Sequence, residues 1–231
     1  MSGAKEQASV VLVHGAWADG SSWNDVIGPL LSKGLDVLAA QIPLTSRTDD
    51  VAALDRTLER TNGPVVLVAH AYAGAVIGAT SNERIRSLVF VAALAPDEGE
   101  SVAEMFYREK PHPETPQLAP DQHGFIWMPR EGFAAAFSHH APAERLLLLA
   151  ATQRPIAIGR LQEKAARPAW RGTPSWYLVA EEDRMINQAT QRFMAKGMGA
   201  RIRSERVDHT PLITAPDLVI APILQAVAAV A

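Results

Sequence analysis

An acid and a histidine in the last quarter of the sequence could work together as a general base. Asp183 lies in an acidic run directly after the apolar run Ser175–Ala180, and His209 follows the run 200–207. The carboxyl ends of parallel strands meet at one edge of a sheet, so we expect the Asp183 carboxylate within hydrogen-bond reach of His209. A carboxylate there orients the imidazole and stabilises its protonated form. Three neighbouring acids could hold the imidazole instead: Glu181, Glu182 and Asp208.

The segment around Ala71 has the spacing of a nucleophile turn but lacks the nucleophile. In the pattern G-x-S-x-G, small flanking residues allow a sharp strand-to-helix turn that exposes the central serine. Here residues 69 to 73 read A-x-A-x-A, so Ala71 stands at the serine position without a hydroxyl. Removing such a serine lowers turnover by about 10⁶-fold. Two interpretations stay open: Ala71 is an engineered replacement that traps substrate or product, or it is natural in a protein that forms no acyl-enzyme.

The segment His14-Gly15-Ala16-Trp17, which follows the apolar run Ser9–Val13, could stabilise negative charge. Glycine at this place lets backbone N–H groups turn towards a ligand, as an oxyanion hole requires. A tight strand-to-helix turn without a binding role is the alternative interpretation of the same four residues.

The elements that must position these residues alternate along the chain. Short apolar runs without polar alternation are typical of strands buried on both faces. We expect strands at residues 9–13, 35–40, 64–69, 87–93, 175–180 and 200–207. We expect helices at 23–33, 49–60, 71–80 and 187–196, and from Pro216 onwards. This rhythm predicts an α/β fold, with a mainly parallel sheet and helices on both of its faces.

The rhythm stops over residues 96–172, which hold nine of the sixteen prolines. We expect this insertion to form a cap over the carboxyl edge of the sheet. Its aromatic side chains are too many for a solvated loop: Phe106, Tyr107, Phe125, Trp127, Phe133 and Phe137. They form either the core of the cap or an apolar pocket for a small molecule. We expect the pocket to be lined by His14, Trp17, Phe106, Phe125, Trp127 and Phe137.

Composition excludes several classes of protein. The 231 residues are 48% hydrophobic and carry a net charge of −3, so a nucleic-acid-binding protein is not expected. Cysteine is absent, which excludes disulfides and thiolate chemistry. No metal-ligand spacing or phosphate loop occurs, so we expect no metal and no cofactor. Residues 1–7 hold no signal segment and no run is long enough to span a bilayer, so we expect a cytoplasmic monomer or homodimer.

Five strings carry a resemblance to the α/β-hydrolase superfamily, in its small esterase and hydroxynitrile-lyase-like branch. They are VVLVHGAW, VVLVAHAYAGAVI, SLVFVAALAP, YLVAEEDRMI and VDHTPLITAPDLV. The resemblance implies one domain over residues 1–231, with a six-stranded parallel core and a small helical cap at about 96–172. It implies Asp183 as triad acid, His209 as triad base, and the amides of Ala16 and Tyr72 as oxyanion donors. Ala71 then stands where this superfamily usually has serine.

Three functions are consistent with these residues. The first is an esterase-type hydrolase of a small apolar substrate, with its nucleophile replaced by Ala71. The second is a lyase-like or water-attacking enzyme that uses the His209–Asp183 pair as a general base without a covalent step. The third is a non-catalytic small-molecule binder, which would not need a base.

Overall fold

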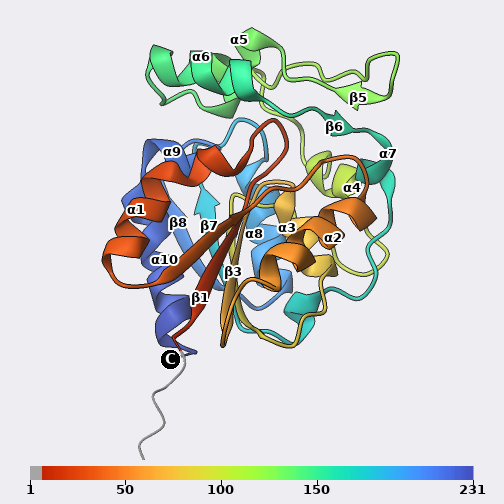
Figure 1. Ribbon diagram of the computed structural model, residues 1–231. Helices are drawn as coiled ribbons and strands as arrows, with labels where there is room; N and C mark the ends of the chain where they lie inside the picture. The colour runs from red at the N-terminus through yellow and green to blue at the C-terminus, as the bar shows by residue number, and fades with distance from the viewer. Residues whose placement is uncertain (1–6, 231) are drawn as a thin grey trace, which may run out of the picture.

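A computed structural model describes residues 7–230 (Figure 1). The expectation that residues 1–7 hold no signal segment falls almost wholly outside this part of the chain. Within it, no helix is both long and apolar enough to cross a membrane.

Six parallel strands form the central sheet, as the sequence predicts, and the structure gives their order as β2-β1-β3-β4-β7-β8. Their bounds are β1 Ser9–Val13, β2 Asp36–Ala40, β3 Val65–His70, β4 Ile85–Val91, β7 Ser175–Ala180 and β8 Arg201–Glu205. The inner strands β1, β3 and β7 are buried at every residue, which is why they read as unbroken apolar runs. The edge strand β8 is largely exposed and accordingly polar.

Helices cover both faces of the sheet (Figure 1). Alternate residues of one strand point to opposite faces, and Leu12 belongs to the buried cluster that includes residues of α1 (Asn24–Ser32) and α10 (Pro216–Ala228). Val13 faces the other side. The helices there are α2 (Arg47–Leu58), α3 (Ala73–Ala79) and α8 (Gln188–Gly197). Two short segments accompany the first layer: the 3₁₀ turn η1 (Gly20–Trp23) and α9 (Pro211–Thr214).

The segment between β4 and β7 supplies the cap, and Figure 1 shows its helices α5 and α6 above the carboxyl ends of the strands. In chain order it contains α4 (Val102–Phe106), β5 (Phe125–Ile126), α5 (Arg130–Gly132), the π-helical turn η2 (Phe133–Phe137), α6 (Ala143–Thr152), β6 (Ile156–Ala157), α7 (Gly159–Gln162) and the 3₁₀ turn η3 (Ala169–Arg171). The strands β5 and β6 pair antiparallel. The end of the segment leaves the cap, because Trp170 of η3 packs beside Gly78 of α3.

Candidate active site

The turn between β3 and α3 has the geometry of a nucleophile elbow. Ala71 has φ 50°, a left-handed conformation that is strained for a residue with a Cβ. Its carbonyl accepts hydrogen bonds from the amides of Leu94 (2.9 Å) and Gly74 (3.1 Å). A Cβ on Gly74 would lie 2.5 Å from the Leu94 carbonyl oxygen, and a Cβ on Gly15 would lie 2.9 Å from the Ala71 Cβ. Glycine at 15 and 74 therefore permits the close packing, while alanine is accommodated at 69, 71 and 73.

Asp183 and His209 are in direct contact next to this elbow. The His209 Nδ1 lies 2.9 Å from the Asp183 Oδ2, and both residues are buried. The other oxygen of Asp183 accepts from the amides of Met185 (2.7 Å) and Ile186 (2.9 Å), so the carboxylate is fixed from behind. A carboxylate only accepts, hence Nδ1 carries the proton and Nε2 is left for chemistry.

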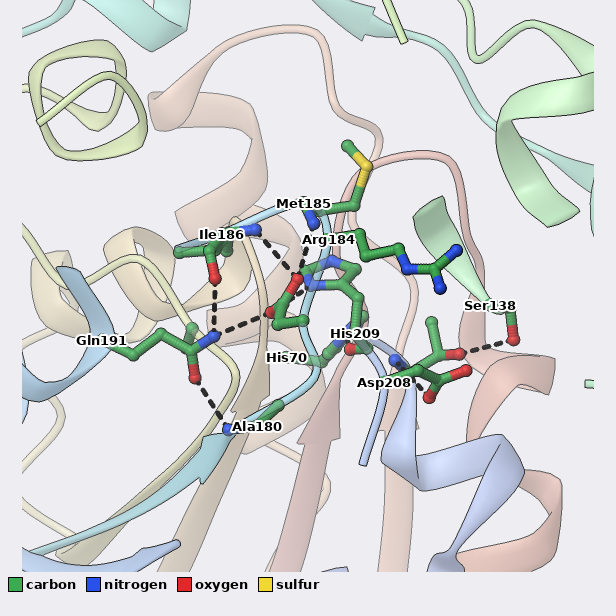
Figure 2. Close-up of polar contacts among 12 residues, drawn as sticks. His70, Ser138, Ala180, Arg184, Met185, Ile186, Gln191, Asp208 and His209 are labelled. Atoms are coloured by element: carbon green, nitrogen blue, oxygen red, sulfur yellow. Dashed lines mark hydrogen bonds and ion pairs between the residues drawn. The ribbon is translucent and has the colours of Figure 1, made fainter. Parts of the chain in front are cut away.

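A glutamine that the sequence analysis did not single out completes the support of the acid. Gln191 donates from its amide nitrogen to the Asp183 Oδ2 (2.8 Å) and to the Ile186 carbonyl (2.9 Å). Its amide oxygen accepts from the Ala180 amide (3.0 Å), and Figure 2 shows these contacts. The available signal was a glutamine on the buried stripe of α8.

The histidine before the elbow supports His209 through the backbone. His70 donates from Nε2 to the His209 carbonyl oxygen (2.8 Å), and the two ring centroids are 4.8 Å apart. The pKa of His70 lies well below its usual value, mainly because the side chain is buried and secondarily because His209 is next to it. His70 is therefore neutral and acts as a hydrogen-bond donor rather than as a second base.

His14 does not line the cavity, contrary to the sequence prediction. It is completely buried, and both ring nitrogens bond to the backbone: Nδ1 donates to the Gly15 carbonyl (2.9 Å), and Nε2 accepts from the Ile42 amide (3.2 Å). Burial lowers the pKa of His14 to about 4, so it is neutral. The prediction placed the side chain beside the substrate because it precedes the oxyanion segment. The ring instead turns away from the cavity, towards the loop after β2.

Two residues beside Ala71 have backbone amides that are free to bind a ligand within the part of the chain that the structure describes. Ala16 and Tyr72 both line the cavity next to Ala71 and His209. Within residues 7–230, neither backbone N–H donates a hydrogen bond. The neighbouring amide of Trp17 is used differently, since it donates to the Arg154 carbonyl of the cap (3.0 Å).

The cavity under the cap has a volume of about 160 Å³ and a mainly apolar wall. Three of the predicted aromatic residues line it, namely Trp17, Phe106 and Phe137, together with Tyr107. The sequence analysis did not single out the aliphatic part of the wall, which includes Leu94, Leu118, Ile126, Ile156, Met185 and Ile186.

Phe125 and Trp127 do not line the cavity, so this part of the predicted pocket is wrong. Successive side chains of a strand point to opposite sides, and in β5 it is the intervening Ile126 that faces the cavity. Trp127 is 49% exposed and donates from its ring nitrogen to Asp121 (3.1 Å).

The acids that could have replaced Asp183 have other partners. Glu181 forms an ion pair with Arg192, and Glu182 with Arg206. Asp208 accepts from the His140 amide of the cap (3.0 Å) and from the Thr214 hydroxyl (2.6 Å). Among the described residues, no group of three or more His, Cys, Asp or Glu side chains could hold a metal ion.

The sequence matches a known protein family. A model of the alpha/beta hydrolase family matches residues 10–221. The chain belongs to the alpha/beta hydrolase family. Methylesterase 2 of Arabidopsis thaliana is 28% identical to this hydrolase, over 94% of the chain and 95% of its own length. A carbendazim hydrolyzing esterase from Nocardioides sp. (strain SG-4G) is 30% identical over 45% of the chain and 49% of its own length.

Solved structures share the fold of this hydrolase. Polyneuridine aldehyde esterase superimposes with a TM-score of 0.83 at 20% identity, covering 95% of this chain and 99% of the other. A pyrethroid hydrolase from Sphingobium faniae JZ-2 gives 0.82 at 17% identity, covering 96% and 98%.

Proposed function

We propose that this protein is an esterase-type hydrolase of small, mainly apolar carbonyl substrates, in which Ala71 has removed the covalent route. The observation that carries the proposal is the Asp183–His209 contact of 2.9 Å beside an apolar cavity, where the amides of Ala16 and Tyr72 donate to no other described residue. The methylesterase and esterase names of its relatives support ester hydrolysis over other reactions of this fold.

The residues present can catalyse ester hydrolysis with water as nucleophile. His209 Nε2 takes a proton from water while the water oxygen attacks the ester carbonyl. The amides of Ala16 and Tyr72 hold the resulting oxyanion. Collapse of the tetrahedral intermediate breaks the bond to the alcohol oxygen, which takes the proton from His209. The products are one acid and one alcohol.

The cavity offers no substitute for the missing serine among its described lining residues. Its hydroxyl groups belong to Tyr72 and Tyr107. The Tyr72 hydroxyl donates to Asp50 (2.9 Å), and burial raises its pKa further from the range in which a phenolate could attack. Tyr107 is 62% exposed, at the rim. Turnover without an acyl-enzyme is therefore expected to be slow.

Restoring the hydroxyl tests the proposal. Ala71→Ser should gain labelling by a fluorophosphonate probe, and turnover of p-nitrophenyl acetate should rise by about 10³-fold or more. Ala73→Ser is the matched control, because it adds a hydroxyl to the same elbow at a position that does not line the cavity. Labelling of the unmodified protein would contradict the proposal, since the nucleophile would then lie elsewhere.

A second function is a small-molecule binder without turnover, and the apolar wall together with Ala71 favours it. His209→Ala separates the two functions. It should abolish base-catalysed hydrolysis, whereas a pure binder would keep its affinity for an apolar ligand such as a naphthyl ester.

A further inference from the structure

Both amides of the proposed oxyanion hole are anchored to one loop, residues 41–46, which follows β2. We propose that Asp50, paired with Arg160 of the cap, is a positioning residue that fixes the Tyr72 amide and makes the oxyanion hole depend on the docked cap. This inference rests on the proposed function.

The first anchor holds the Ala16 side of the hole. His14 bonds to the Gly15 carbonyl on one side of its ring and to the Ile42 amide on the other. The turn that presents the Ala16 amide is thereby tied to the first part of the 41–46 loop.

The second anchor holds the Tyr72 side. The Tyr72 hydroxyl donates to the Asp50 Oδ2 (2.9 Å), so the side chain of the elbow residue is fixed at its far end. The Asp50 Oδ1 accepts from the Leu44 amide (2.7 Å). Leu44 has φ 63°, a strained conformation for a leucine, and this bond holds it there. A shift of Asp50 would therefore move both the elbow residue and the 41–46 loop.

Arg160 brings the cap into this arrangement. It lies in α7 and is 1% exposed, and its Nη1 is 2.5 Å from the Asp50 Oδ2. Its guanidinium carbon lies 5.2 Å from the centre of the Tyr72 ring. Within the described residues, its Nε and Nη2 atoms have no hydrogen-bond partner. A buried ion pair with unpaired donors adds little to the free energy of folding compared with apolar residues of the same size. We therefore assign the Asp50–Arg160 pair the role of orienting Tyr72.

The cap contacts the same region at two further points. The Arg154 carbonyl accepts from the Trp17 amide (3.0 Å), next to Ala16. The Ala157 amide donates to the Leu44 carbonyl (3.2 Å). Cap residues 154–160 thus contact the oxyanion turn, the 41–46 loop and, through Asp50, the elbow. Of these contacts, the pair of Arg160 with Asp50 is the one that reaches Tyr72.

The test uses the Ala71→Ser protein, in which hydrolysis can be measured. Tyr72→Phe removes the hydroxyl contact with Asp50 and keeps the ring, and Arg160→Met removes the charge and keeps the bulk. We expect each to lower kcat for p-nitrophenyl acetate by about tenfold or more while KM changes little, because the oxyanion forms only after substrate binds.

Arg47→Met is the matched control. Arg47 holds the same cap segment by donating to the Glu163 and Lys164 carbonyls and, at 3.5 Å, to the Arg160 carbonyl, but it does not bond to Asp50 or to the Arg160 side chain. Its kcat should stay within about twofold of the parent. An equal loss in Arg47→Met and Arg160→Met would mean that Arg160 acts only by holding the cap, which would overturn the inference.

A second measurement does not depend on catalysis. In ¹⁵N-labelled Ala71 protein, Arg160→Met should shift the amide resonances of residues 72 and 16, and Tyr72→Phe should shift that of residue 16, whereas Arg47→Met should leave both in place. If Ala71→Ser gains no turnover, the proposed function fails, but the amide spectra still decide this inference. Unchanged resonances of residue 16 in Tyr72→Phe and of residues 72 and 16 in Arg160→Met would overturn it.

Discussion

Gly74→Ala should destabilise the protein although alanine is the better helix residue. The new Cβ would lie 2.5 Å from the Leu94 carbonyl oxygen and 3.0 Å from the Ala93 Cβ. The first separation is about 1 Å shorter than an optimal non-bonded contact. Leu94 cannot move freely, because its amide donates to the Ala71 carbonyl of the elbow. Overpacking of this kind costs about 1–3 kcal/mol, against a helical gain of about 0.5–1 kcal/mol.

Gly78→Ala, in the same helix, is the internal control. Its Cβ would meet the Pro168 Cβ at 3.7 Å and a Trp170 ring carbon at 3.9 Å, which are ordinary contacts. This variant should gain up to about 1 kcal/mol. Urea unfolding followed by tryptophan fluorescence measures both changes as shifts of the midpoint at constant slope. If Gly74→Ala is as stable as Gly78→Ala, the close approach at the elbow is not a constraint and the reasoning is refuted.

Three further predictions concern pH, the cavity wall and the support of the acid. The pKa of His14 is about 4 in the folded protein and 6.5 when exposed, so between these pH values the unfolded chain binds a proton that the folded protein does not. The free energy of unfolding should therefore be at its full value above pH 6.5 and fall by about 3 kcal/mol as the pH drops to 4. His14→Gln should flatten that part of the pH dependence measured by urea unfolding. Ile126→Ala should enlarge the cavity and alter the ester chain length preferred by the Ala71→Ser protein, whereas Trp127→Ala should not, and equal effects in the two would contradict the assignment of the wall. Gln191→Leu should lower the free energy of unfolding by about 1–3 kcal/mol and lower turnover of the Ala71→Ser protein, because Asp183 loses a donor and the Ala180 amide loses its acceptor. An unchanged melting temperature by circular dichroism together with unchanged kinetics would count against this prediction.

The sheet and the contact between Asp183 and His209 could be predicted because both follow from order along the chain. Buried parallel strands read as apolar runs, and residues that follow such strands come together at one edge of the sheet. The elbow could be predicted from its small residues. The predicted helix over 71–80 begins two residues late, at Ala73, because the elbow occupies its first turn.

The rest depends on contacts that leave no local pattern. Asp50 and Arg160 are 110 residues apart, and no periodicity links a residue of α2 to a residue of the cap. The β5 strand has two residues, too few for alternation to show that Ile126 rather than Phe125 faces inward. His14 was placed in the wrong surroundings because sequence gives its position on the chain but not the side towards which its ring turns.

The buried pair of Asp50 and Arg160 limits how caps can be exchanged between proteins of this fold. A grafted cap without arginine at position 160 would leave Asp50 enclosed with no countercharge, and removing one partner of such a pair typically costs about 3–5 kcal/mol. The Leu44 amide and the Tyr72 hydroxyl would then be the remaining partners of that carboxylate. A chimera built on this scaffold must therefore carry Arg160 with its cap, or replace Asp50 and Arg160 together.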